Sequence, residues 1–227
     1  VWLTDSDMDI LAETGTAICH NPSSNLRLKS GIAPLNRMLE KGVTVAIGID
    51  EAGINDDNDM LQEMRLAQKI HRVPGVASPS PTSHQILHLA TANGAKVTFF
   101  GDEVGTLEPG RRADMVLVGL ERLVEPYLHP DTNMVDALVY RGRGLDVDTV
   151  IVDGEVLLRN KVFTRLARAA RLAAAGAAGS ASPPSDTATD EPIAIFCAGQ
   201  MTIHTLAAIV VPRRKPNEMP IPAAERK

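Results

Sequence analysis

The sequence has few cysteines and no excess of positive charge. Cys19 and Cys197 are the only two cysteines among 227 residues, and they lie far apart. This excludes a disulfide framework and a zinc site built from paired thiolates. Lys and Arg total 23 against 28 Asp and Glu, so the formal net charge is −5, which argues against a nucleic-acid partner. We therefore expect a reducing compartment, the cytoplasm, and no nucleic acid.

The first residues also lack the features of a secretory leader. The segment from Val1 to Asp7 has no basic region, no apolar run and no cleavage site, and the chain does not begin with Met. A secreted start is unsupported, and we expect residues before Val1 in the native protein. A hydrophobic fraction of 44% with 22% charged residues predicts a globular protein of one or two domains.

Residues 1–100 show the pattern of a parallel sheet. Apolar runs rich in β-branched residues alternate with segments of helical period, which is typical of βαβ units. Asp59 is the expected N-cap of the second helix. The predicted strands are Thr16–His20 and Val43–Ile49, and the predicted helices are Leu35–Glu40, Met60–Ile70 and Ser83–Ala92.

Residues 101–164 predict a small β unit, and residues 165–227 an Ala/Pro-rich, poorly ordered tail. The expected strands are Ala113–Gly119, Val147–Val152 and Glu155–Leu158, the last two joined by a turn centred on Asp153 and Gly154. The tail begins with nine Ala in residues 167–181 and then holds seven of the fifteen prolines. Its apolar stretch, residues 193–211, has borderline length for a membrane span and contains polar residues, so a membrane partner is not expected.

Polar side chains follow both predicted strands of the first region. Asp50 comes directly after Val43–Ile49, where parallel α/β folds carry functional groups, although an ordinary loop carboxylate that caps the next turn is an equal alternative. At the end of the other strand, His20 can bind metal or substrate, and Asn21, Ser24 and Asn25 can hydrogen-bond a polar heterocycle. The alternative is a satisfied histidine followed by an Asx or Pro turn.

Other motifs favour structural roles. Asp56, Asp57 and Asp59 lack the pattern of a calcium loop and predict turns and helix caps. His84 and His88 share a helix face but lack the Glu of a zincin, and His71 and His129 are interpreted as surface or loop residues. The turn from Gly105 to Gly110 has neither a phosphate-loop Lys nor a strand-to-helix context, so nucleotide binding is not predicted.

Four blocks, in order, resemble the amidohydrolase superfamily, in its branch of nucleobase and adenosylhomocysteine deaminases and triazine hydrolases. The resemblance covers residues 1–164. The blocks are His20-Asn21-Pro22-Ser23-Ser24-Asn25 with its continuation to Pro34, Gly48-Ile49-Asp50, Glu63-Met64-Arg65-Leu66-Ala67, and Gly105 to Asp114.

The resemblance implies an α/β fold and a metal-dependent hydrolase. The chain would be the C-terminal portion of a (β/α)8 TIM barrel (residues 1–100), followed by a small β-sandwich portion (residues 101–164) and the low-complexity tail. Asp50 matches the eighth-strand metal ligand, a catalytic residue that contacts one zinc or iron ion and shuttles protons, while the metal activates water. His20, Asn21, Asn25 and Glu51 match substrate-binding positions. The implied reaction is hydrolysis of carbon-nitrogen bonds, other than peptide bonds, in a cyclic, nitrogen-rich small molecule, as in a deaminase.

Departures from the family pattern are equally specific. The first-strand His-x-His pair, the fifth-strand His with its Glu, and the sixth-strand His have no counterpart in this sequence. One carboxylate cannot hold a catalytic zinc, which takes about three protein ligands. The leading interpretation is therefore a truncated hydrolase, and the alternative is a non-catalytic fragment of such an enzyme. A homo-oligomer is compatible with either, and open sheet edges predict poor solubility for the chain alone.

Overall fold

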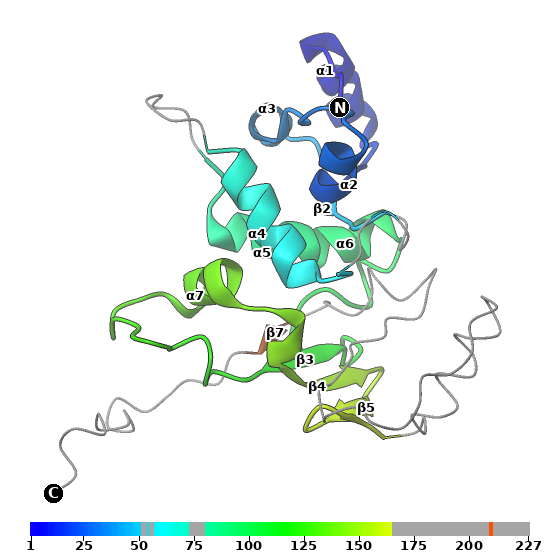
Figure 1. Cartoon of the computed structure of the whole chain (residues 1–227). Helices are drawn as coiled ribbons and strands as arrows, with labels where there is room; N and C mark the ends of the chain where they lie inside the picture. Colours follow the sequence, from blue (N-terminus) through cyan, green and yellow to red (C-terminus); the bar gives the residue numbers. More distant parts are fainter. Residues whose placement is uncertain (51–53, 55–56, 73–79, 165–208, 211–227) are drawn as a thin grey trace, which may run out of the picture.

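The computed structural model describes residues 1–50, 54, 57–72, 80–164 and 209–210 (Figure 1). The elements of the first region are α1 (Asp5–Thr14), β1 (Ile18–His20), α2 (Pro22–Arg27), α3 (Leu35–Glu40), β2 (Val45–Ile47), α4 (Met60–Ile70), α5 (Ser83–Ala90) and α6 (Ala92–Val97). Those that follow are β3 (Met115–Val118), α7 (Met134–Arg141), the 3-10 turn η1 (Gly144–Asp146), β4 (Val147–Val152), β5 (Glu155–Arg159), β6 (Val162–Phe163) and β7 (Ile209–Val210).

Strands β1 and β2 pair in parallel, as the sequence predicts. Ile18 lies opposite Val45, and His20 lies opposite Ile47. The parallel ladder continues one step further, because the amide of Gly48 donates to the carbonyl of His20 at 3.0 Å. Both strands therefore end at the same edge, and the residues that follow them, Asn21 and Asp50, start from neighbouring positions.

Helix α4 forms where the apolar spacing predicts it, over Met60–Ile70. The side chain of Asp59 accepts hydrogen bonds from the amides of Leu61 and Gln62, so this residue is the N-cap as expected. Met60, Leu61 and Met64 are buried and pack in the core. The predicted helix over residues 83–92 is divided at Thr91, whose backbone leaves helical geometry and separates α5 from α6.

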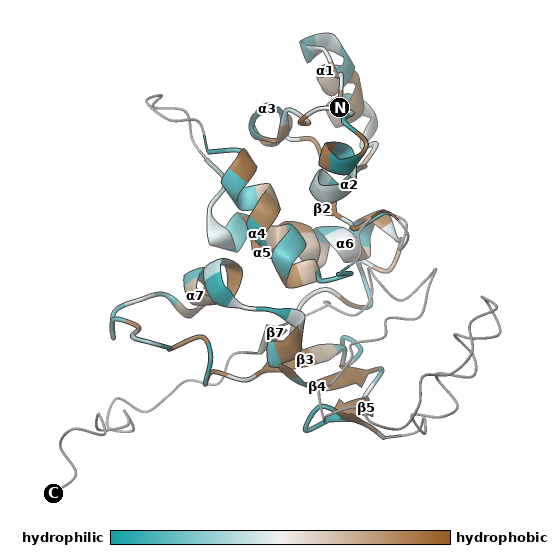
Figure 2. Ribbon diagram, viewed as in Figure 1, coloured by the Kyte–Doolittle hydropathy of each residue, from teal (hydrophilic) through white to brown (hydrophobic). Residues whose placement is uncertain are grey.

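The second region contains a five-stranded sheet in the order β6-β5-β4-β3-β7. All pairs are antiparallel except β3 with β7. Asp153 and Gly154 both have positive φ, 50° and 79°, so they form the tight hairpin turn that the Asp-Gly pair predicts. The strands of this sheet carry mostly apolar residues (Figure 2), and α7 lies between the sheet and the helices of the first region (Figure 1).

One hydrophobic core joins the two regions. Buried residues of β2, such as Val45 and Ile47, belong to the same cluster as Val116 of β3 and Leu138 of α7. The fold is mixed α/β, with two adjacent parallel strands covered by helices. This arrangement is consistent with part of a TIM-barrel-type domain, which closes with eight such strands.

The predicted tail lies almost wholly outside the described residues. Only Ile209 and Val210 of it are described, as strand β7 alongside β3. Among the helices that the structure describes, none has the length and apolar character needed to cross a membrane.

Candidate active site

Asp50 lies three residues after the end of β2 and is held by a serine from the neighbouring segment. Its backbone is left-handed, with φ 72°, a conformation that costs energy for a residue other than glycine. The hydroxyl of Ser24, on α2, donates to Asp50 Oδ2 at 2.6 Å, and Ser24 is only 1% exposed. Asp50 itself is exposed, so its carboxylate is open to solvent on one side and anchored on the other.

Asn21 packs tightly across the ends of the two strands. Its Oδ1 accepts a hydrogen bond from the Cys19 thiol at 3.3 Å. A Cβ atom on Gly48 would lie 2.5 Å from Asn21 Oδ1 and 2.6 Å from Cys19 Sγ, so a larger residue there would displace these two side chains. Burial raises the pKa of the Cys19 thiol, and the nearby negative charge of Asp50 raises it further. Asn25 lies half-buried on α2, one turn beyond Asn21.

His20 forms a buried pair with His71, which corrects the interpretation of His71 as a surface or loop residue. The two Nε2 atoms are 3.0 Å apart, and the residues are 2% and 5% exposed. His71 is the C-cap of α4, where the chain turns inward, and its carbonyl accepts from Asn36 Nδ2. In the sequence, Arg72-Val73-Pro74-Gly75 indicates that the helix ends here. This motif carries no information on the direction of the His71 side chain.

The histidine pair is neutral. Burial, together with the nearby His71 and the positive charge of the N-terminus, lowers the pKa of His20 to about 4, and burial lowers the pKa of His71 to about 4. Within the described part of the chain, His20 Nδ1 is buried without a hydrogen-bond partner. A buried orphan N–H is rarer than an orphan acceptor, so we place the His20 proton on Nε2, donating to His71.

Glu63 is a site residue that sequence reasoning missed. It is 1% exposed on α4, and its Oε1 accepts from the Ser23 amide at 2.8 Å and from the Ser23 hydroxyl at 2.9 Å. Burial raises the pKa of this carboxyl, and the two bonds from Ser23 act in the opposite direction. The sequence does hold a signal for Glu63. This residue lies three residues after Met60 and four before Ala67, on the same apolar face of the helix. A charged residue on such a face is seldom buried without a partner.

The described residues do not make a complete metal site. Within them no group of three or more His, Cys, Asp or Glu side chains is close enough together to hold a metal ion. Asp50 offers carboxylate oxygen, and His84 and His88 are exposed on α5. Glu51, predicted to bind substrate, lies outside the described residues. Asp50 can therefore serve as one ligand of a metal ion. The described part of this chain does not supply the other ligands that a complete site needs.

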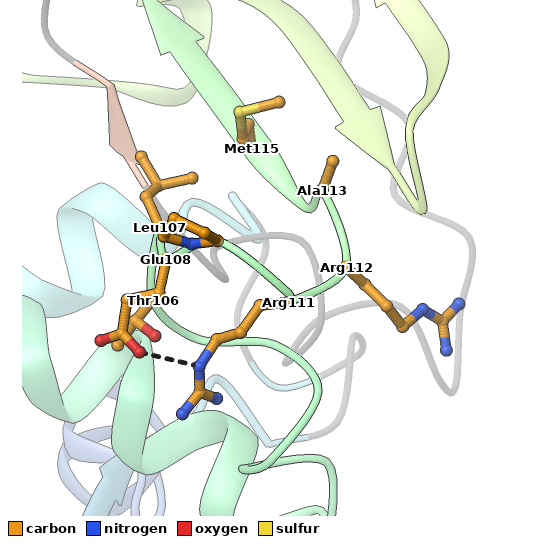
Figure 3. Close-up of a pocket in the computed structure, with 8 residues that line it drawn as sticks. Thr106, Leu107, Glu108, Arg111, Arg112, Ala113 and Met115 are labelled. Carbon is orange, nitrogen blue, oxygen red and sulfur yellow. Dashed lines mark hydrogen bonds and ion pairs between the residues drawn. The ribbon is translucent and has the colours of Figure 1, made fainter.

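A cavity of about 240 Å³ lies beside the start of β3 and includes none of these residues (Figure 3). Its lining is the turn before the strand, where Arg111 bonds Glu108 and donates to the carbonyls of Gly101 and Val104. Arg112 points away from Arg111 and pairs with Glu103 and Asp153. Both arginines thus hold the turn.

Comparison with known proteins decides the family. Residues 1–157 match the Amidohydrolase family. The chain belongs to this family. It is 46% identical over 164 residues to the 5-methylthioadenosine/S-adenosylhomocysteine deaminase of Desulforudis audaxviator, covering 71% of this chain and 37% of that protein. It is 42% identical over 160 residues to the 5'-deoxyadenosine deaminase of Methanosarcina acetivorans, covering 70% of this chain and 36% of that protein.

Solved structures of amidohydrolase-type enzymes resemble this fold. An adenosine deaminase from Xanthomonas campestris with bound zinc superposes with a TM-score of 0.70 at 31% identity, over 76% of this chain and 39% of that one. An atrazine chlorohydrolase from Arthrobacter aurescens complexed with zinc gives 0.64 at 28% identity, over 78% and 39%. This amidohydrolase chain thus spans little more than a third of the length of the relatives it matches.

Proposed function

We propose that this chain is the C-terminal part of a metal-dependent aminohydrolase that removes an amino group from the ring of an adenosine-type nucleoside. The observation that carries the proposal is the anchored carboxylate of Asp50 at the edge where β1 and β2 both end. The names of its relatives, deaminases of adenosine derivatives, support the substrate class. The polar groups around Asp50 suit a nitrogen-rich heterocycle.

Asp50 is proposed as one ligand of a single divalent ion and as a proton carrier. Its Oδ2 is occupied by the Ser24 hydroxyl, which leaves Oδ1 for the ion. Zinc is preferred over iron because two similar solved enzymes hold zinc. The other ligands would come from the barrel strands that this chain does not span, either in the same polypeptide or in a second one.

The residues beside Asp50 are proposed to shape the substrate pocket. Asn21 and Asn25 supply amide groups for the ring, and Glu51 follows Asp50 on the loop. His20 has one ring nitrogen engaged by His71, and its unpartnered Nδ1 is the group that remains to meet a ligand. The β3–β6 sheet is proposed as one portion of a small β-sandwich whose other strands come from elsewhere in the enzyme.

The test is ammonia release from 5'-deoxyadenosine by the native protein isolated from its source. We expect activity that a chelator removes and zinc restores, and that Asp50→Asn lowers by at least about a hundredfold together with its metal content. Asp131→Asn, which changes an equally charged but 91% exposed side chain, is the matched control and keeps full activity. A native protein that contains no metal and releases no ammonia would favour the non-catalytic fragment.

A further inference from the structure

Helix α2 carries two residues of the candidate site, Ser24 and Asn25, yet the side chain of its N-cap residue, Asn21, does not cap it. Asn21 makes no side-chain hydrogen bond to the first turn, because its amide oxygen is turned toward Cys19 and Gly48. The first amides of a helix need an acceptor. Here Glu63 of α4 supplies one from 40 positions away, accepting from the amide of Ser23 in that first turn.

The same carboxylate oxygen also accepts from the Ser23 hydroxyl, so two donors of a single residue converge on Glu63 Oε1. The next residue, Ser24, donates to Asp50 Oδ2. Hydrogen bonds at two consecutive residues of α2 therefore connect α4 to the carboxylate after β2. Glu63 and Ser24 are each only 1% exposed, so one partner in each contact is shielded from water.

We propose that Glu63 is a positioning residue that fixes the orientation of the Asp50 carboxylate through Ser23 and Ser24. This inference rests on the proposed function of Asp50 and adds a residue to it. Asp50 is exposed, and among the described residues the Ser24 hydroxyl is the hydrogen-bond donor to its side chain. With Ser24 in place, Oδ2 accepts its hydroxyl and Oδ1 is presented. Without Glu63, the amide and the hydroxyl of Ser23 lose this buried acceptor, and the turn of α2 that carries Ser24 is held less firmly.

Nuclear magnetic resonance of the native protein tests this relay directly. In the wild type we expect a slowly exchanging Ser24 hydroxyl proton and a Ser23 amide shifted downfield by its carboxylate acceptor. Glu63→Ala removes the Ser24 signal and moves the Ser23 amide upfield, whereas Glu63→Gln, which keeps an amide oxygen at the same reach, retains the Ser24 signal. Glu13→Gln on the exposed face of α1 is the control and changes neither signal.

A Ser24 hydroxyl that stays protected in folded Glu63→Ala overturns the inference. If that variant does not fold, Glu63→Asp keeps the charge and shortens the side chain by one methylene, and the same loss of the Ser24 signal is expected. In the metal-loaded enzyme, Glu63→Ala lowers kcat by roughly tenfold to a hundredfold with KM unchanged, the size expected for a misplaced catalytic group. Metal content unaffected by Asp50→Asn would instead refute the proposed function, whatever the Ser24 signal shows.

Discussion

At the scale of single residues, the His20–His71 pair depends on a single proton. Its hydrogen bond needs one imidazole nitrogen to donate and the other to accept, so the two rings cannot both be protonated. The pair joins the end of β1 to the end of α4. Protonation of both rings would leave two donors and two positive charges facing each other in a buried setting, where the Nε2 atoms are 3.0 Å apart, and would separate the two elements.

This pair makes the stability of the protein fall on mild acidification. Both folded pKa values are about 4, below the ordinary 6.5, so between these values the unfolded chain binds more protons. The contribution of the pair to stability is complete above about pH 7 and is lost as the pH falls toward 4, by up to about 1.4 kcal/mol per pH unit for each histidine.

Urea unfolding at a series of pH values checks this expectation. His71→Gln, which keeps a polar partner for His20 but cannot titrate, should flatten the dependence between pH 6.5 and 5. His84→Gln, at an exposed position of α5, is the control and should leave it unchanged. Equal slopes in the wild type and in His71→Gln would contradict the account.

The sequence singles out candidate residues but not the contacts that hold them. Asp50, His20 and Asn21 become candidates because each stands where a predicted apolar strand stops. The bonds that hold them come from Ser24 and from Glu63 and His71 on α4, far along the chain. No local pattern specifies which way a helix face or a C-cap side chain turns, because tertiary packing decides it.

At the scale of elements, α4 connects the candidate site to the second region. Glu63 contacts α2, whereas Arg65 contacts α7 and its C-cap, and Asp59 contacts the segment after α7. Asp59 Oδ2 accepts from the Gly144 amide at 2.8 Å while its other oxygen caps the helix. The Arg65 guanidinium donates to the carbonyls of Val139 and Gly142. Helix α4 therefore links the second region to the edge that carries Asp50.

Asp59→Ala is expected to destabilise the fold by about 2 kcal/mol, because it removes a helix cap and a hydrogen bond between the two regions. Asp59→Asn keeps one acceptor oxygen, which can serve the helix cap or the Gly144 amide but not both, and should cost less than Asp59→Ala. Chemical denaturation followed by circular dichroism gives both values. A decrease in the free energy of unfolding of less than about 0.5 kcal/mol for Asp59→Ala would show that the cap and the contact with Gly144 do not stabilise the fold.

The elements that the sequence predicted are those with a clear period or a clear turn. Met60–Ile70 and Val147–Val152 agree with the structure at both ends. Helix α1 is not among the predicted elements, although Thr4 and Asp7 form a capping box. In the sequence, Val1 to Asp7 is interpreted only in terms of a secretory leader. Helix α2 was missed because Asn21-Pro22 resembles a turn, and its cap lies on another helix. Sequence alone does not reveal a cap supplied from 40 residues away.

At the scale of the whole molecule, several large hydrophobic side chains are exposed at the end formed by α1 and α2. These side chains lie on the two helices and the segments that flank them, at the opposite end from the β3–β5 strands (Figure 1). They are Trp2 (84%), Ile10 (55%), Leu26 (41%), Leu28 (58%) and Ile32 (52%). In the described sheet, β1 and β2 also each have one unpaired edge. Such surfaces are normally covered.

We expect the 227-residue chain expressed alone to self-associate. Light scattering after size-exclusion chromatography should show species larger than a monomer, growing with protein concentration. Trp2→Ser with Leu28→Ser should reduce this growth, whereas Val162→Ser, at an exposed apolar residue of β6, should not. A monomer with a sharp, reversible thermal transition would contradict the expectation.

Native mass spectrometry of the protein isolated from its source tests the central claim most directly, since it reports the assembly mass and the bound metal together. The account predicts a mass well above that of the 227 residues alone, made up by the remaining barrel strands, with about one divalent ion per barrel that is lost in Asp50→Asn. A metal-free species with the mass of this chain, unchanged by Asp50→Asn, would contradict it.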